Sequence, residues 1–259
     1  ALGFPDLLLH LLLPEGSTTA LDPTFLRIAG ATLIISAAAE GCLQDAAANN
    51  RLSSATYQRL MVACVVKSTG FLLAFALAQP LWCPQLVLTY PTSAAASILL
   101  SLSVLIQTNS KGGQQTIPNL SVVLAPKNVT SAAYGLICLV YLGTAAICYA
   151  PPSAPSLFVG QVEASTQLLQ HTWAPGFLLA AVAALNLKDA ADRGRLGAST
   201  FKRLNLGLAG VELVYSAVFA GALLAEPAVA VRDAGGLSNL VASVGIACFC
   251  LYQWQTAKK

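Results

Sequence analysis

Residues 131–150 read SAAYGLICLVYLGTAAICYA and contain no charged side chain. A helix needs about 20 consecutive apolar residues to cross the hydrocarbon core of a bilayer, so this run predicts a transmembrane helix. Six further apolar runs of near-spanning length flank it, at residues 25–43, 60–82, 93–107, 168–187, 204–225 and 237–254. The sequence therefore predicts an all-α, polytopic membrane helix bundle of about seven transmembrane helices.

The composition supports a membrane protein and excludes an ordinary soluble domain. Hydrophobic residues make up 56% of the 259 residues and charged residues only 10%, with a mean hydropathy of +0.68. A soluble domain carries roughly 25% charged residues, which keep its surface hydrated. The net charge of +3 is modest, and the basic residues sit in short clusters beside apolar runs. This pattern does not indicate nucleic-acid binding.

The distribution of basic residues predicts the orientation of the chain. If the seven runs alternate across the membrane, one side receives eleven basic residues, namely Arg51, Arg59, Lys111, Lys127, Lys188, Arg193, Arg195, Lys202, Arg203, Lys258 and Lys259. The other side receives only Arg232, while Arg27 and Lys67 lie inside runs. Basic residues favour the inner face of a membrane. We therefore expect the N-terminus on the outer or lumenal face and the C-terminus on the inner or stromal face.

The chain contains an internal repeat. Residues 43–60 read LQDAAANNRLSSATYQRL and residues 187–204 read LKDAADRGRLGASTFKRL, with 9 of 18 positions identical at an offset of 144. Both segments are predicted inner loops entered in the same direction, which indicates a parallel duplication. A three-plus-one-plus-three plan fits: residues 1–24 as an outer interfacial segment, 25–108 as a first repeat, 109–150 as a loop and connecting helix, and 151–259 as a second repeat. Repeated helical hairpins fit as well.

The repeated loop carries charges at corresponding positions, namely Asp45, Arg51 and Arg59 in the first copy and Asp189, Arg195 and Arg203 in the second. We expect the aspartate of each copy to pair with the first arginine across the turn. Thr56 and Thr200 are predicted to cap the following helices. The loop is interpreted either as a docking or gating element or as a tight basic loop of the kind common on inner faces.

Two charges lie at bilayer depth, where an ionised side chain is costly and needs a partner or a role. The repeat offset places Lys67 opposite Val211, next to Glu212. Their equal depth predicts a Lys67–Glu212 ion pair. A coupling role in transport is the alternative interpretation.

Few other side chains suggest chemistry. His171 and Glu40 are candidate ligands for a pigment or a metal, and each is otherwise interpreted as an interfacial polar residue. The sequence contains no GxSxG, HExxH or phosphate-binding-loop motif in a suitable context, so no enzymatic activity and no metal site are expected. Cys83 and Cys148 are predicted at matching depths and are a candidate disulfide, with two reduced thiols as the alternative.

Two functions fit these features. The first is a non-catalytic accessory subunit of a large organellar membrane complex, with a thylakoid photosystem of photosynthesis as the favoured case. It would contact lipid and neighbouring subunits and would have chlorophyll and carotenoid as candidate cofactors. The second is a small-solute transporter. Seven helices in a parallel three-plus-one-plus-three plan, with a Pro84-Gln85 dipeptide, resemble the SWEET and PQ-loop carriers in topology.

Overall fold

The computed structural model describes residues 22–77, 86–110, 125–149, 164–224 and 233–257. Seven helices in these ranges are long and apolar enough to cross a membrane. They are α2 (Asp22–Ala48), α3 (Ala55–Leu77), α4 (Leu86–Ser110), α6 (Val129–Tyr149), α7 (Ala164–Asp192), α8 (Ser199–Leu224) and α9 (Asp233–Thr256). The chain is thus an all-α integral membrane protein with seven candidate spans, as its apolar runs predict.

Each of the seven helices begins before the apolar run predicted for it. The third helix, predicted over residues 93–107, begins at Leu86 as α4, and Pro91 lies inside it. Pro91 is the sixth residue of α4, beyond the first four residues whose N–H groups have no partner within a helix, so it removes one backbone hydrogen bond from α4. The candidate span itself runs from Pro91 to Thr108.

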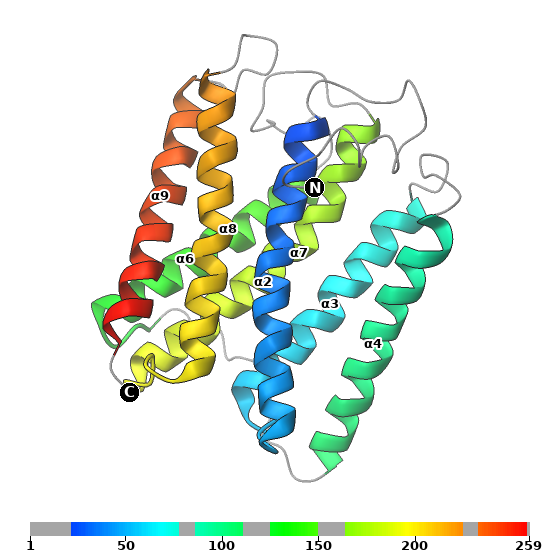
Figure 1. Ribbon diagram of the computed structural model, residues 1–259, viewed down its shortest axis with the longest axis vertical. Coiled ribbons are helices and arrows are strands. Elements are labelled where there is room, and N and C mark those ends of the chain that lie inside the picture. The colour runs from blue at the N-terminus through cyan, green and yellow to red at the C-terminus, as the bar shows by residue number, and fades with distance from the viewer. Residues whose placement is uncertain (1–21, 78–85, 111–124, 150–163, 225–232, 258–259) are drawn as a thin grey trace.

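Four helices form the centre of the bundle (Figure 1). α2 packs on α8, α3 packs on α7, and α2 also packs on α7. The other helices are peripheral: α4 lies on α3, α6 on α7 and α9 on α8. The loop between α2 and α3 and the loop between α7 and α8 lie at the same end of the bundle (Figure 1). We call this the basic end, because residues 49–59 and 193–203 contain five arginines.

Close helix crossings in the centre depend on small residues, as is common in membrane bundles. A Cβ atom built on Gly176 of α7 would lie 2.3 Å from Thr32 Cβ of α2. On Gly207 of α8 it would lie 2.6 Å from Ala38 Cβ of α2. Thr32 and Gly176 are 144 residues apart, the offset of the repeated segments, and α2 and α7 cross where these two residues meet.

The two loops at the basic end follow the same backbone path. Asn50 and Gly194 occupy corresponding positions and have left-handed φ angles of 53° and 64°. The amide of the next residue closes each helix end with a 2.8 Å hydrogen bond, from Arg51 to Ala46 and from Arg195 to Ala190. Asparagine and glycine are the residues that adopt this conformation most readily.

The predicted threonine caps are wrong. The carbonyl groups of Ser54 and Ala198 accept the first bonds of α3 and α8, from Gln58 and Lys202. Thr200 therefore lies inside the first turn of its helix, and its hydroxyl bonds across helices to Tyr57 Oη at 2.8 Å.

Candidate functional site

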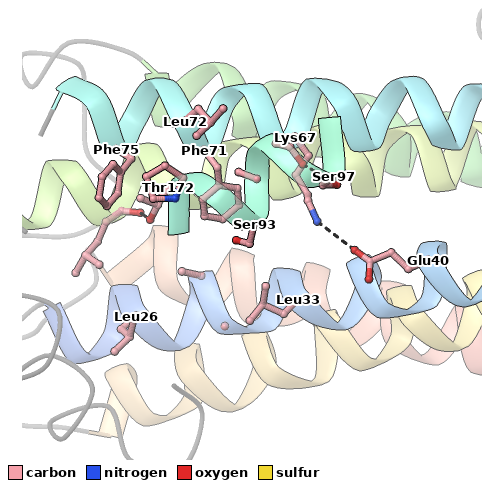
Figure 2. Close-up of a pocket in the computed structure, with 16 residues that line it drawn as sticks. Leu26, Leu33, Glu40, Lys67, Phe71, Leu72, Phe75, Ser93, Ser97 and Thr172 are labelled. Atoms are coloured by element: carbon pink, nitrogen blue, oxygen red, sulfur yellow. Dashed lines mark hydrogen bonds and ion pairs between the residues drawn. The ribbon is translucent and has the colours of Figure 1, made fainter. Parts of the chain in front are cut away.

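A cavity of about 330 Å³ lies between α2, α3, α4 and α7 (Figure 2). Its walls are mostly apolar, with Leu26 and Leu33 on α2 and Phe71, Leu72 and Phe75 on α3. Polar side chains also line it, namely Glu40, Lys67, Ser68, Ser93, Ser97 and Thr172. It is thus a pocket at membrane depth that contains a mostly buried ammonium group.

Lys67 makes its polar contacts with α2. Its Nζ donates a 3.0 Å hydrogen bond to Ser36 Oγ and lies 3.8 Å from Glu40 Oε1. Figure 2 shows the Lys67 and Glu40 side chains pointing toward each other across the cavity. The Lys67 side chain is 12% exposed, whereas that of Glu40 is 64% exposed. Glu40, a candidate pigment or metal ligand from sequence, is therefore the counter-ion of the buried lysine.

The predicted Lys67–Glu212 pair does not form. Glu212 is buried on the other side of the bundle, where Tyr141 Oη of α6 donates a 2.5 Å hydrogen bond to its Oε1. The prediction failed because α3 and α8 face opposite ways. α3 turns its charged position toward α2 and α4, while α8 turns Glu212 toward α6 and α9. Equal depth on corresponding helices therefore does not bring two residues together.

Glu212 lines a second, smaller cavity of about 80 Å³. Residues 144 positions apart, the offset of the repeated segments, line the two cavities, namely Ala29/Trp173, Leu33/Phe177, Ser68/Glu212, Phe71/Tyr215, Phe75/Phe219 and Thr172/Ile28. Two of these pairs place a large aromatic residue of α7 where α2 has a smaller side chain. The second cavity is also lined by Tyr141 and Thr144 of α6. The second cavity is smaller because two aromatic side chains of α7 and further side chains of α6 occupy part of its space.

One face of α2 is exposed, although the corresponding face of α7 is buried. On α2 the face consists of Ala29, Leu33, Ala37, Glu40 and Gln44, and we call it the α2 stripe. Leu33 is 56% exposed, and Ala37 and Gln44 are exposed as well. The corresponding residues of α7 are all buried: Trp173, Phe177, Ala181, Ala184 and Lys188. α6 packs along α7, and no described helix packs along the α2 stripe in the same way.

The charged residues of the repeated loops form ion pairs at the basic end. Asp45 and Arg51 form an exposed salt bridge of 2.7 Å. Asp189 does not pair with Arg195 as predicted, but with Arg59 at 2.7 Å and Arg193 at 2.9 Å. The Arg59–Asp189 bridge joins α3 to α7 and is mostly buried. The second loop therefore differs from the first because an arginine from another helix reaches its aspartate.

Further contacts between the two loops involve corresponding positions. Cys42 Sγ contacts the carbonyl of Thr200 at 3.6 Å, and Asn186 Nδ2 donates to the carbonyl of Thr56 at 3.2 Å. Asn186 is the counterpart of Cys42 in the repeat, as Thr200 is of Thr56. Arg203 donates to the carbonyl of Gly41. The basic end is thus a reciprocal contact between the two helix pairs.

Other candidate residues have structural partners or lie outside the described ranges. The His171 ring stacks with Tyr149 at a centroid distance of 6.0 Å. Within the described residues, no group of three or more His, Cys, Asp or Glu side chains is placed to hold a metal ion. Cys148 is buried, but Cys83 lies outside the described residues, and so do residues 1–21 of the interfacial segment predicted over residues 1–24.

Sequence reasoning missed the hydroxyl groups around Glu212 and the buried ion pair of Lys188 with Asp192, whose Nζ and Oδ2 are 2.6 Å apart. The spacing of four residues on one helix was the available signal for the ion pair. For Tyr141 and Tyr215, tyrosine inside an apolar run was a weaker signal, because tyrosine is also a common core residue.

Comparison with known proteins gives no relative: no protein family, curated protein or solved structure matches this chain.

Proposed function

We propose that this protein is a non-catalytic subunit of a larger membrane complex and that the α2 stripe receives a transmembrane helix of a partner subunit. The observation that carries the proposal is the difference between α2 and α7: the same face is exposed on one helix and buried under α6 on the other. A helix docked on α2 would occupy the place that α6 occupies on α7.

This proposal includes an internal duplication. Its support is the 9 identical positions in 18, the matching left-handed turns and the cavities lined by corresponding residues. In a pair of units related by an axis along the membrane normal, equivalent faces point in opposite directions. α6 covers one such face, and the other is left for a separate chain.

The chemistry of the α2 stripe suits a helix. Ala29 and Ala37 allow close approach, which drives helix association where lipid supplies no hydrophobic force. The cavity beside Leu33 can accept a large side chain from the partner, as the Trp173 and Phe177 side chains fill the corresponding space beside α7. Glu40 offers an exposed acceptor to a donor on the partner helix, because Lys67 lies 3.8 Å away and leaves much of the carboxylate open.

The favoured setting is a thylakoid photosystem assembly, with chlorophyll and carotenoid as candidate cofactors. We expect the basic end to face the stroma, because basic residues favour the inner side of a membrane. A C-terminal tag should then be protected from protease added to the lumenal side. The sequons at Asn119 and Asn128 should carry no glycan, and a glycan at either would invert the orientation.

The test compares bulky substitutions on two exposed faces in the native membrane. Ala37→Trp would block a helix on the α2 stripe, while Leu136→Trp changes the outward face of α6, where Leu136 is 64% exposed. We expect Ala37→Trp to shift the chain from a large complex to a free form on native gels. Leu136→Trp should leave the complex intact. Thermal unfolding in detergent should be the same for both variants, because neither site is in the core.

A second candidate function, a small-solute transporter, is favoured by the 330 Å³ cavity around Lys67. In this case the wild-type chain should purify as a monodisperse small species, and Ala37→Trp should not change its size. An anionic solute should raise the melting temperature of the wild type but not of Lys67→Met. If the wild type comigrates with a large complex and Ala37→Trp releases it, the subunit proposal holds.

A further inference from the structure

The 80 Å³ cavity around Glu212 contains polar groups that the helix-docking proposal does not use. It lies between α6, α7, α8 and α9, with Ile28 of α2 also in its wall, and its polar lining residues include Glu212, Tyr141, Tyr215, Ser243 and Asn239. Glu212 is 3% exposed. It belongs to the candidate span Ser199–Leu224, so its carboxylate is separated from water by the bundle.

The negative charge of this carboxylate has no basic partner in the described part of the chain. Glu212 accepts hydrogen bonds from Tyr141, at 2.5 Å, and from Ser243. Neither hydroxyl carries a charge, and no described Lys or Arg forms a salt bridge with it. An ionised group without a counter-ion is strongly disfavoured at bilayer depth. A cation in the cavity or a proton on Glu212 must therefore balance the charge.

Tyr215 supplies a second, independent sign of a ligand. Its hydroxyl is fully buried, lines the same cavity and has no hydrogen-bond partner in the described structure. A fully buried hydroxyl group without a partner destabilises the folded state. A ligand that accepts a hydrogen bond from this hydroxyl group, or a cation that its oxygen coordinates, would give the group a partner.

The donor atoms, the charge and the volume of the cavity indicate which class of ligand it binds. The polar atoms come from one carboxylate, the neighbouring hydroxyl groups and the Asn239 amide, and oxygen donors suit hard cations. A single negative charge is balanced by a single positive one. The cavity of about 80 Å³ exceeds the roughly 10–15 Å³ that a cavity needs in order to hold one water, so an ion and a water fit. We propose that the Glu212 cavity binds one monovalent cation of the Na⁺ type.

The corresponding positions around the first cavity provide matched controls. Ser68 occupies the position of Glu212, and its hydroxyl is bonded to Ser97 at 3.2 Å. Phe71 occupies the position of Tyr215 and has no hydroxyl. At these two positions the first cavity therefore lacks the Glu212 carboxylate and the Tyr215 hydroxyl group that line the second cavity.

The test is thermal unfolding of the purified full-length chain in detergent at constant pH and ionic strength, with NaCl exchanged for choline chloride. We expect Na⁺ to raise the melting temperature of the wild type and of Ser68→Ala. Glu212→Gln should remove the response. Tyr215→Phe should raise the Na⁺ concentration at half-effect by about tenfold, equivalent to about 1.4 kcal/mol. Equilibrium binding of radioactive Na⁺ to the wild type gives a second readout if Glu212→Gln does not fold.

Two outcomes would overturn the proposal. One is a wild-type melting temperature that does not depend on Na⁺, with no bound radioactive Na⁺. The other is a response to Na⁺ that Glu212→Gln and Tyr215→Phe leave unchanged. If acidification stabilises the wild type while Na⁺ has no effect, the charge is balanced by a proton and the cation site is refuted. None of these results depends on whether a helix docks on α2, so the two proposals fail separately.

Discussion

Gly176→Ala tests the helix crossing at the centre of the bundle. The new Cβ would lie 2.3 Å from Thr32 Cβ and 2.6 Å from Thr32 Cγ2. Carbon atoms pack at about 3.5–4.0 Å, so α2 and α7 would have to separate by about 1.2 Å at least. Thr32 Cβ is attached to the backbone and cannot rotate away. Over-packing then costs about 3 kcal/mol, the upper part of its usual range.

The helix propensity of alanine offsets about 1 kcal/mol of this cost, which leaves a net loss of about 2 kcal/mol in the free energy of unfolding. Thr32→Gly alone should cost about 1.5 kcal/mol, through lost packing and lower propensity. In the double variant the clash is absent, and the net loss should fall to about 0.5 kcal/mol. The coupling energy between the two changes is therefore about 3 kcal/mol.

Reversible unfolding in mixed detergent micelles measures these differences. Gly143→Ala on α6 is the matched control, because a Cβ there meets no heavy atom within 4 Å. It should be neutral or slightly stabilising. The reasoning is refuted if Gly176→Ala is as stable as Gly143→Ala, or if the effects of the two changes at the crossing simply add.

Two further predictions concern charged side chains. Arg59→Met should lower the free energy of unfolding by about 3–5 kcal/mol, because it leaves the buried Asp189 carboxylate with only the exposed Arg193 as a partner. Arg51→Met, which breaks an exposed salt bridge, should lower it by less than about 1 kcal/mol. Equal losses in the unfolding assay would contradict this prediction. The losses in the free energy of unfolding caused by Lys67→Met and Glu212→Gln should add within about 0.5 kcal/mol, because the two residues line separate cavities. A larger coupling energy in the same assay would support a direct Lys67–Glu212 ion pair.

Much of the architecture could be read from local properties of the sequence. A run of apolar residues long enough to cross the bilayer has few alternatives to a helix, because backbone polar groups must bond within the segment. The helix count and the approximate residue range of each span follow from this requirement. The matching turns at Asn50 and Gly194 follow from the residues themselves, since a left-handed conformation suits asparagine and glycine.

The partners of the charged residues depended on the tertiary structure. Their positions within the apolar runs place Lys67 and Glu212 at the same depth in the membrane. The faces that α3 and α8 turn toward their neighbours decide that Lys67 meets Glu40 and that Glu212 meets Tyr141. Likewise, nothing in the sequence of α2 or α7 indicates that α6 covers only one of them. Side-chain direction and helix coverage arise from contacts between residues far apart in the chain. A periodic pattern along one helix contains no information about these contacts.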